Sequence, residues 1–400
     1  MKRLAILGST GSIGCEALKV VERHSERFVI QTLAANRSVE ALAEQVRRVK
    51  PRCAVLADPD ALLEGASSLA GGPNGHDASE PSWRVGREAL LEAARASDVD
   101  VVLNALVGFA GLAPTLEALR AGKRVALANK ESLVAGGPLV LQAATEGGGQ
   151  LVPVDSEHSA ILQCLEGYPR SSIHRLVITA SGGPFRGWSP GALESVGPED
   201  ALRHPTWDMG AKITVDSATL ANKALEVIEA HFLYDIPYDA IDVVVHPQSV
   251  VHSFVEFVDG SVIAQMGFPT MELPILYALS YPDRLDDASL RTFDPVGSSP
   301  LTFEEVDHAA FPLFGLGLEA GRAGGTAPAA FNAANEVAVE AFLKRGTNFP
   351  GMAVGVKAAL EEVVSVPVRH PQDVMEADRR AREVARKALT TKASADRRPG

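Results

Sequence analysis

Arg3-Leu4-Ala5-Ile6-Leu7-Gly8-Ser9-Thr10-Gly11-Ser12-Ile13-Gly14 opens the chain with a short apolar run and a glycine-rich turn. The glycines are spaced G-x-x-G-x-x-G, and a helical pattern follows over residues 14–24. Glycine lets a backbone approach a pyrophosphate closely, and a helix N-terminus offers N–H groups and a positive dipole end to an anion. Because the turn follows a strand and opens a helix, it favours a dinucleotide site over a tight turn without a ligand.

Residues 1–150 continue as alternating strands and helices. Strands are expected at residues 3–7, 28–34, 54–57, 99–105 and 124–128, and helices at 14–24, 38–49 and 111–121. This alternation predicts a parallel, doubly wound sheet. The Gly-, Pro- and Ser-rich stretch at 66–82 indicates a surface insertion.

The remainder of the chain has a different texture, which predicts further domains. We expect a catalytic α+β domain over residues 151–285 with a lid loop at about 200–211. A connector over 286–310, a helical bundle over 311–392 and a disordered tail over 393–400 follow. In the α+β domain, residues 212–215 predict a strand, Asp216 or Ser217 an N-cap, and residues 218–232 a helix. The fold class is therefore α/β, with an N-terminal Rossmann-like parallel sheet, an α+β catalytic domain and a C-terminal helical bundle.

Composition narrows the classes of function. The chain has 400 residues, 46% hydrophobic and 22% charged, and no apolar run of about 18 residues that would predict a membrane span. The net charge of −12 argues against a nucleic-acid partner but leaves room for a local basic pocket that binds an anionic substrate. The three isolated cysteines fit a reducing cytoplasm and exclude a cysteine-based zinc site.

The end of the second predicted strand indicates which nucleotide binds. A site for NAD would carry an acid there, to hold the ribose 2′-hydroxyl. This chain has Asn36-Arg37-Ser38 instead, and Arg37 can pair with a 2′-phosphate while Ser38 donates to it. The residues therefore favour NADP(H); the alternative is a surface charge at Arg37 and a helix N-cap at Ser38.

Two acids follow the apolar run at residues 151–154. In an extended backbone Asp155 and Glu157 would share one face, and two such acids with only oxygen ligands predict a hard divalent cation, Mg²⁺ or Mn²⁺. The alternative is that they cap a helix expected at 159–166. Lys130, directly after the fifth predicted strand, would lie near these carboxylates and near the nicotinamide end of the cofactor.

Donors for a phosphate occur in two places. Ser217, Asn222 and Lys223 lie near a predicted helix start, where a phosphate site is favoured. The alternative is that these residues form a solvated helix face with a Lys223–Glu226 ion pair. If a phosphate binds there instead, Glu226 could be a third carboxylate ligand of the cation. Ser181, in a small-residue turn after a strand, predicts either an anion cradle or a plain β-turn.

Three loops carry further candidate residues. The stretch from Arg203 to Gly210 places a His, a Trp and a Met in a loop, which suits a lid over a substrate or a buried aromatic anchor. The loop at 266–271, which ends in Met271, could face a cofactor ring. His252 is either a substrate ligand or a satisfied core histidine.

Together these motifs closely resemble the 1-deoxy-D-xylulose 5-phosphate reductoisomerase family over nearly the full length. The motifs are Gly8-Ser-Thr-Gly-Ser-Ile-Gly14, Asn129-Lys-Glu131, Pro153-Val-Asp-Ser-Glu-His158, Ser181-Gly-Gly-Pro-Phe185, His204-Pro-Thr-Trp-Asp-Met-Gly210, Val215-Asp-Ser-Ala-Thr219 with Asn222, Lys223 and Glu226, and His246-Pro-Gln-Ser-Val-Val-His252. The resemblance implies a homodimeric cytoplasmic oxidoreductase that uses NADPH and Mg²⁺ or Mn²⁺. Its implied reaction cleaves and rejoins a carbon–carbon bond of 1-deoxy-D-xylulose 5-phosphate and reduces the product to 2-C-methyl-D-erythritol 4-phosphate, in isoprenoid precursor biosynthesis.

The resemblance also implies roles for residues. The metal ligands would be Asp155, Glu157 and Glu226, and these acids with Lys130 and His204 form the predicted catalytic set. The predicted substrate-binding residues are Lys130, Ser156, Glu157, Ser181, His204, Trp207, Met209, Ser217, Asn222, Lys223, Glu226 and His252. The predicted NADPH-binding residues are Gly8, Thr10, Gly11, Ser12, Ile13, Asn36, Arg37, Ser38, Asn129, Glu131, Gly210 and Met271. The family more often has Gly-Lys-Asn where this chain has Asn36-Arg37-Ser38. Arg in place of Lys keeps the cation. Asn in place of Gly at position 36 can shift the local backbone.

Two other functions compete with this one. A different NADP-dependent sugar-phosphate or semialdehyde dehydrogenase would share the cofactor motifs, but simple hydride transfer needs no chelated metal and so leaves the three carboxylates unexplained. A non-catalytic NADP-binding sensor would oxidise no NADPH.

Overall fold

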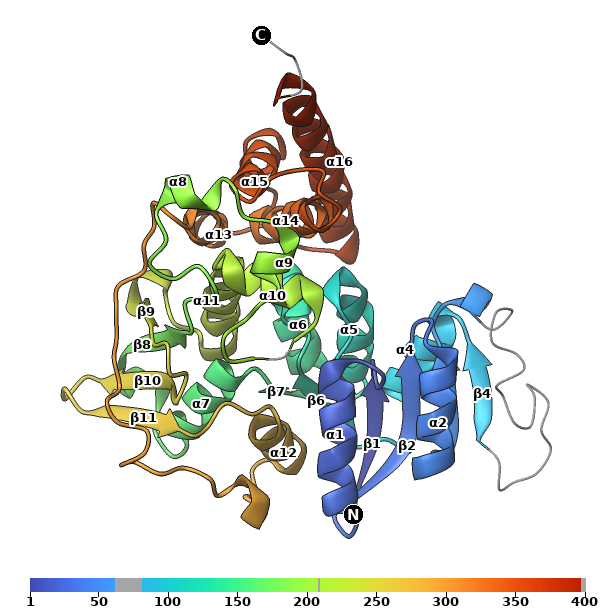
Figure 1. Cartoon of the computed structure of the whole chain (residues 1–400). Helices are drawn as coiled ribbons and strands as arrows, with labels where there is room; N and C mark the ends of the chain where they lie inside the picture. The colour runs from blue at the N-terminus through green and yellow to red at the C-terminus, as the bar shows by residue number, and fades with distance from the viewer. Residues whose placement is uncertain (62–80, 208, 397–400) are drawn as a thin grey trace. The chain divides into compact units, whose positions relative to one another are not determined.

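The computed structural model describes residues 1–61, 81–207 and 209–396, which form two compact units (Figure 1). The first unit contains the described residues of Met1–Ser132 together with Val140–Ser159 and Thr270–Leu290. The second contains Leu133–Leu139, Ala160–Pro269 and the described residues from Arg291 onward. Helices α6 (Lys130–Gly147) and α7 (Ser156–Leu165) contribute to both units.

The first unit is built on a parallel sheet of seven strands in the order β4-β3-β2-β1-β5-β6-β7. The strands are β1 (Lys2–Leu7), β2 (Phe28–Ala35), β3 (Cys53–Leu56), β4 (Ser82–Val85), β5 (Val101–Asn104), β6 (Arg124–Leu127) and β7 (Gln150–Pro153). The last four residues of β1 and all of β5 are buried, as both faces of a parallel sheet require. The predicted doubly wound sheet is therefore confirmed, and its strand order reverses between β1 and β5.

Helices α1 (Ser12–Arg23), α2 (Val39–Val49), α4 (Arg87–Arg95), α5 (Leu112–Arg120) and α12 (Glu272–Ser280) complete the first unit. Helix α12 comes from far along the chain, yet the ammonium group of Lys2 donates to the carbonyls of Leu279, Ser280 and Tyr281 at 3.2, 2.5 and 3.0 Å. A cation at the C-terminal end of a helix is favourable because the last carbonyls lack helical partners. Strand β1 is therefore held to a helix that comes much later in the sequence.

The second unit has a mixed sheet in the order β11-β10-β8-β9. Its strands are β8 (Ile173–Ala180), β9 (Ile241–Val245), β10 (Val251–Phe257) and β11 (Val262–Met266). Strand β10 is antiparallel to β8 and β11, whereas β9 is parallel to β8. Short helices α8 (Pro190–Leu193), α9 (Pro198–Ala201) and α10 (Ala211–Ala218) precede the longer α11 (Ala221–Tyr234).

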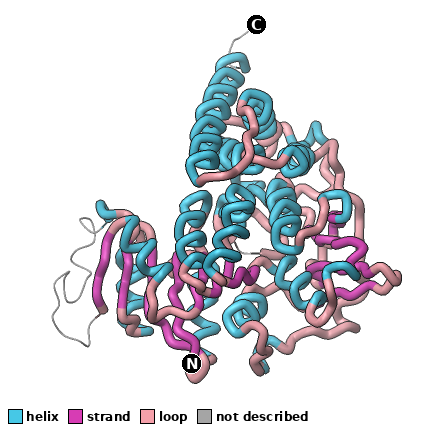
Figure 2. Tube along the Cα trace, turned by 180° about the vertical axis from the view of Figure 1, so that it is seen from behind, coloured by secondary structure: helices cyan, strands magenta, loops and turns pink. Residues whose placement is uncertain are grey.

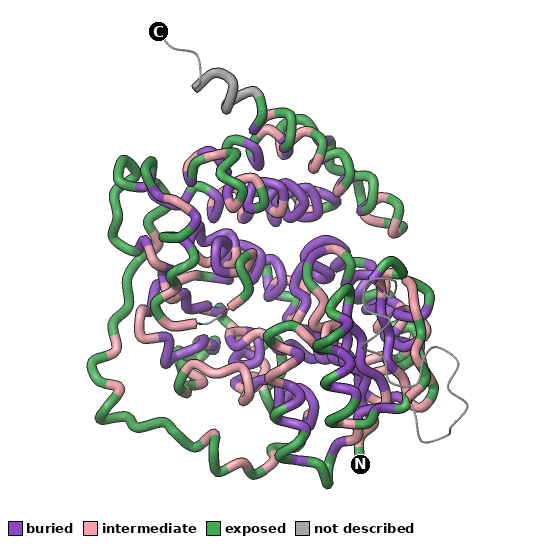
Figure 3. The backbone as a smooth tube through the Cα atoms, turned by 45° about the vertical axis from the view of Figure 1, so that its right-hand side comes forward, coloured by how far each residue is buried: buried purple, intermediate pink, exposed green. Residues whose placement is uncertain are grey.

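The C-terminal region is helical, as predicted (Figure 2). Its helices are α13 (Pro312–Ala323), α14 (Ala327–Leu343), α15 (Gly351–Glu362) and α16 (Pro371–Asp396). One apolar core joins these helices to α11. Figure 3 colours the backbone by burial, and the C-terminal helices carry stretches in the colour of buried residues. The packing is tight where a Cβ on Gly317 of α13 would lie 2.4 Å from Ala224 of α11. The bundle and the mixed sheet therefore share one unit.

The strand predicted at residues 212–215 is wrong, because these residues form helix α10. The β-branched Ile213, Thr214 and Val215 favour a strand locally, but Thr214 and Val215 are buried and tertiary packing overrides that preference. The predicted N-cap at Asp216 or Ser217 is wrong for the same reason, since both lie inside α10. Helix α11 begins at Ala221, after Leu220 in the left-handed conformation.

Other local predictions also change. Helix α7 begins at Ser156, so Asp155 directly precedes it and Glu157 lies in its first turn. The extended backbone assumed for these two acids is therefore wrong. Both acids lie at the start of a helix, where the capping alternative placed them, and a capping role stays a prediction. Strands β4 and β9 were not predicted. Residues 66–80 of the predicted insertion lie outside the described residues, as do residues 397–400 of the predicted tail, whereas 393–396 belong to α16.

The predicted domain bounds at residues 150 and 285 stay a prediction. Strand β7 pairs with β6 in the parallel sheet, and α12 groups with the first unit. Within the described ranges, no helix has both the length and the apolar character needed to cross a membrane.

Candidate active site

The glycine turn packs the end of β1 against the end of β5. Gly8 has φ +86°, and a Cβ there would lie 2.4 Å from the carbonyl oxygen of Ala105. A Cβ on Gly14 would lie 2.4 Å from the carbonyl oxygen of Gly8, so α1 can approach the strand only because this residue is glycine. Gly11 and Ser12, at the start of α1, are exposed. The turn therefore presents a helix N-terminus at the point where the strand order reverses, as a dinucleotide site requires.

Gln45 of α2 supports this turn from behind. Ser9 Oγ donates to Gln45 Oε1 at 2.7 Å, and Gln45 Nε2 donates to the Ser9 carbonyl at 2.8 Å; both residues are buried. Gln45 was not predicted from the sequence. The signal was available, because Gln45 is a polar residue among the buried apolar positions of α2.

Arg37 lies just beyond the carboxyl end of β2, where Asp58 holds it. Arg37 Nη1 is 2.6 Å from Asp58 Oδ2, and half of the Arg37 side chain remains exposed. Ser38 precedes α2, as the N-cap alternative expected, but its side chain makes no capping hydrogen bond. Asp58 was not identified from sequence, although an acid two residues after a parallel strand lies at the ligand-binding edge of the sheet.

Asn129 and Glu131 are buried and organise the loop after β5. The Asn129 amide donates to the carbonyls of Leu106 and Gly108 at 2.7 and 2.9 Å and to Glu131 Oε2 at 3.0 Å. Asn129 Oδ1 accepts from the backbone N–H of Ser132 at 3.1 Å. These contacts fix the backbone at the carboxyl edge of β5 and β6, next to the glycine turn.

Lys130 lies beside one of the two acids, as predicted. Its Nζ is 2.5 Å from Asp155 Oδ2, and its side chain is only 6% exposed. Ser156 Oγ donates to Glu157 Oε2 at 2.6 Å. A buried ammonium group thus balances the charge of Asp155, while Glu157 accepts a hydrogen bond from its neighbour.

In the second unit, His204 lies between two serine hydroxyls. Its Nε2 is 3.0 Å from Ser181 Oγ and 3.1 Å from Ser217 Oγ. Its Nδ1 accepts from the backbone N–H groups of Thr206 and Trp207 at 3.1 and 2.9 Å, so the proton of the neutral ring must be on Nε2. Burial lowers the pKa of His204 from 6.5 to about 4, so the ring is neutral near pH 7. The cluster is therefore a set of neutral donors that suits an oxyanion.

Glycines bring the two serines together. Gly182 and Gly183, which follow β8, have φ of +85° and +66°. A Cβ on Gly183 would lie 2.9 Å from the carbonyl oxygen of Ser217, so a larger residue would push α10 away from the turn. The turn after β8 and the end of α10 therefore meet because Gly183 has no side chain.

The first turn of α11 adds a cation and a carboxylate. Asn222 Nδ2 and Lys223 Nζ lie 2.5 Å from Glu226 Oε1 and Oε2, respectively. The pair predicted between Lys223 and Glu226 is present, but the solvated face is wrong, since these residues are 4% and 1% exposed. Buried charges are retained only when they are paired, and such pairs often mark a functional site.

The remaining candidates lie in loops or in the core. Trp207 is partly exposed, and its backbone N–H anchors the loop to His204; Asp208 lies outside the described residues. Met209 and Gly210 lead into α10, where both carbonyls face the Thr214 hydroxyl. His252 is buried in β10. Met271 is partly exposed and precedes α12.

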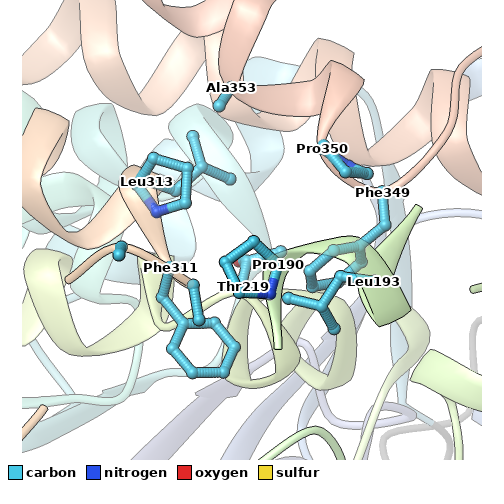
Figure 4. A pocket seen from close by; sticks show the side chains of 11 residues that line it. Pro190, Leu193, Thr219, Phe311, Leu313, Phe349, Pro350 and Ala353 are labelled. Atoms are coloured by element: carbon cyan, nitrogen blue, oxygen red, sulfur yellow. The ribbon is translucent and has the colours of Figure 1, made fainter. Parts of the chain in front are cut away.

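Two cavities of the second unit differ in polarity. An apolar cavity of about 80 Å³ is lined by residues including Leu193, Phe311, Leu313 and Phe349, and it has no charged group to hold a phosphate (Figure 4). A cleft of about 430 Å³ has Ser181 in its wall, together with two arginines, Arg186 and Arg203, and one acid, Asp200. An anionic ligand therefore fits beside Ser181 and not in the apolar cavity.

Three models of one protein family match successive parts of the chain. The family model for 1-deoxy-D-xylulose 5-phosphate reductoisomerase matches residues 4–137, and its C-terminal domain model matches residues 151–234. A further model, the DXP reductoisomerase C-terminal domain, matches residues 266–384.

Individual relatives cover almost the whole chain. The 1-deoxy-D-xylulose 5-phosphate reductoisomerase of Gloeobacter violaceus is 48% identical over 386 residues, which cover 96% of this chain and 97% of the relative. The structure of the Zymomonas mobilis reductoisomerase in complex with NADPH is 41% identical, has a TM-score of 0.88 and covers 97% of this chain and 99% of its own. A structure of DOX-P reductoisomerase with NADPH, fosmidomycin and magnesium is 38% identical, with a TM-score of 0.91 and coverage of 97% and 98%. The chain belongs to the 1-deoxy-D-xylulose 5-phosphate reductoisomerase family.

Proposed function

We propose that this chain performs the reaction of its family, the NADPH- and divalent-metal-dependent conversion of 1-deoxy-D-xylulose 5-phosphate to 2-C-methyl-D-erythritol 4-phosphate in isoprenoid precursor biosynthesis. The observation that carries the proposal is the similarity along the whole chain to a reductoisomerase structure that contains NADPH, fosmidomycin and magnesium. The geometry of each unit supports it, because one unit offers a dinucleotide cradle and the other a cluster of phosphate donors.

The first unit would hold NADPH. The turn from Gly8 to Ile13 would take the pyrophosphate at the N-terminus of α1. Arg37, already oriented by Asp58, would pair with the 2′-phosphate, with Ser38 as a second donor and Asn36 beside them. Asn129 and Glu131 would shape the backbone near the nicotinamide, and Gly210 and Met271 complete the proposed cofactor set.

Oxygen ligands would hold the divalent cation. Asp155, Glu157 and Glu226 supply carboxylates, which are the ligands that Mg²⁺ and Mn²⁺ prefer. When bound, the cation polarises carbonyl and hydroxyl oxygens of the substrate as a Lewis acid, and NADPH supplies the hydride. Lys130 would hold Asp155 in place and offer its ammonium group to a substrate hydroxyl.

The second unit would bind the phosphate group of the substrate. The hydroxyls of Ser181 and Ser217 can rotate to donate, and His204 offers the N–H of Nε2 between them. Asn222 and Lys223 add an amide and a cation at the start of α11. Ser156, Trp207, Met209 and His252 are proposed as further substrate contacts, with Trp207 and Met209 on the lid.

Two properties of the whole enzyme remain proposals. We infer a cytoplasmic homodimer from the resemblance to the family. The three cysteines are in the described part of the chain and form no disulfide, which fits a reducing compartment. Sedimentation of the purified chain at working concentration would report the oligomeric state, and a monomer would contradict this part of the proposal.

The decisive experiment measures NADPH oxidation by the purified chain with 1-deoxy-D-xylulose 5-phosphate, with and without EDTA. We expect turnover that needs both substrate and divalent metal. Oxidation that persists in EDTA would favour a simple sugar-phosphate or semialdehyde dehydrogenase. NADPH binding without oxidation would favour a sensor.

A further inference from the structure

Asp216 is a buried carboxylate next to Ser217 that the proposed reaction does not use. It lies in the last turn of α10 and is 1% exposed. Lys212 Nζ lies 2.9 Å from its Oδ2, and Asn335 of α14 donates through Nδ2 to its Oδ1 at 2.7 Å. Asn335 is fully buried. The contact therefore joins the C-terminal helices to the element that carries Ser217.

An acid at this position works against the stability of α10. A buried carboxylate loses its hydration, and a negative charge in the last turn opposes the helix dipole. The Asn335 amide and the Lys212 ammonium group offset that loss, but a small apolar residue would avoid it altogether. The contact thus gives α10 a defined orientation instead of additional stability.

The orientation of α10 needs such a contact. The helix has 8 residues, too few to be stable without tertiary packing. Neighbouring residues in a helix point about 100° apart, so fixing Asp216 against α14 also fixes the direction of Ser217. Ser217 Oγ lies 3.1 Å from His204 Nε2, inside the donor cluster. A rotation of α10 would move Ser217 away from that cluster.

Helix α14 is itself held in place beside Asn335. Glu336 Oε2 accepts from Arg382 Nη2 of α16 at 2.5 Å, and Arg382 also pairs with Asp378 at 2.7 Å. Asn332 donates to Glu336 Oε1 at 3.0 Å within the same helix. The amide of Asn335 is therefore presented from a helix that a partly buried ion pair, Glu336 with Arg382, holds against α16.

We propose that Asn335 is a positioning residue for substrate binding, which acts through Asp216 to aim Ser217 at the phosphate group of the substrate. The proposal rests on the proposed function in one respect, that Ser217 contacts this phosphate. It assigns the C-terminal helices a part in substrate affinity.

The test exchanges the two partners of the hydrogen bond. Asn335→Asp places two carboxylates face to face and should raise the KM for 1-deoxy-D-xylulose 5-phosphate about tenfold, because a charge-assisted bond is replaced by repulsion. The KM for NADPH should change less than about twofold, since no cofactor contact is altered. The double variant Asp216→Asn with Asn335→Asp restores one amide and one carboxylate, and should recover most of the substrate affinity.

Asn332→Asp is the matched control, because it adds an acid to a buried position one turn earlier in α14, where the replaced amide donates to Glu336 of the same helix and not to Asp216. It should lower the melting temperature but leave the substrate KM unchanged. If Asn335→Asp does not fold, Asn335→Ser removes the same contact without adding charge. An unchanged substrate KM in Asn335→Asp and Asn335→Ser, or a double variant no better than Asn335→Asp, would overturn the proposal.

A second readout does not depend on turnover. Inorganic phosphate should raise the melting temperature of the wild-type chain, and Asn335→Asp should need more phosphate for the same rise. If the wild-type chain fails to convert 1-deoxy-D-xylulose 5-phosphate, the proposed function is wrong. The phosphate titration then still decides the positioning role, because equal titrations of the wild type and Asn335→Asp would refute it.

Discussion

At the scale of single residues, two backbone N–H groups determine the protonation state of the His204 ring. They occupy Nδ1, so a second proton on the ring would face two donors as well as the loss of hydration. Burial lowers its pKa from 6.5 to about 4. Between pH 6.5 and about 4, His204 is therefore protonated in the unfolded chain but neutral in the folded chain. The folded state loses stability as the pH falls through this range.

We expect this loss to depend on His204 itself. His204→Asn keeps an acceptor for the two N–H groups but does not titrate. The melting temperature of the wild type should exceed that of the variant near pH 7.5, and the difference should narrow as the pH is lowered toward about 4.5. Two curves that stay parallel across this range would show that His204 does not control the effect.

Arg37 should select the cofactor. Arg37→Gln removes the guanidinium group and should raise the KM for NADPH about tenfold or more, while the KM for NADH stays nearly constant. Asp58→Asn serves as the control, since it loosens the arginine without removing it. Steady-state kinetics with both cofactors measure the effect, and equal losses for the two would place Arg37 away from the 2′-phosphate.

Glu226 should set the requirement for metal. Glu226→Gln is nearly isosteric but removes an anionic ligand, so activity should collapse at low Mg²⁺ and recover in part with Mn²⁺, which binds N and O ligands more tightly. Lys223→Met breaks the same buried pair yet keeps the carboxylate, and should raise the substrate KM without changing the metal requirement. Near-normal activity of Glu226→Gln at low Mg²⁺ would remove Glu226 from the metal site.

At the scale of elements, the turn after β8 and helix α10 act as one assembly. Both Gly183 and Gly187 have positive φ, but only a Cβ on Gly183 would collide with α10. Substitutions at these two glycines therefore distinguish the cost of an unfavourable φ from the cost of displacing Ser217.

Gly183→Ala should raise the substrate KM about tenfold, because a small displacement of a positioning group weakens binding strongly. Gly187→Ala should lose only about 1–2 kcal/mol of stability from its left-handed backbone. Kinetics and thermal melting of both variants measure the difference. The same substrate KM in the two variants would show that the close approach of Gly183 to Ser217 is not needed.

Helix α10 also shows where local preference fails. Ile213, Thr214 and Val215 have the composition of a strand, and only burial against distant elements makes them helical. The pair of Lys223 with Glu226 was predictable because the residues are three positions apart on one helix. Its burial was not, because the covering residues come from elsewhere in the chain.

At the scale of the whole molecule, what could be predicted was local in sequence. The parallel sheet was predicted from the alternation of strand and helix patterns. The glycine turn was predicted from glycines at positions where the backbone must approach a ligand or turn tightly. The contacts of Gln45, Asp58 and Asn335 could not be predicted, because their partners lie 36, 21 and 119 residues away. Strand β7 was recognised as an apolar run, but its place in the sheet depends on pairing with β6.

The tie between Lys2 and the end of α12 has a consequence for synthesis. These groups are separated by 277 residues, and a ribosome adds about 5–20 residues each second. The nascent chain therefore spends tens of seconds with its first strand made and the helix that completes that unit not yet translated. Throughout this interval, the surface of α1, β6 and β7 that α12 later contacts stays open to chaperones. A message truncated before α12 would release a chain in which that surface is never closed.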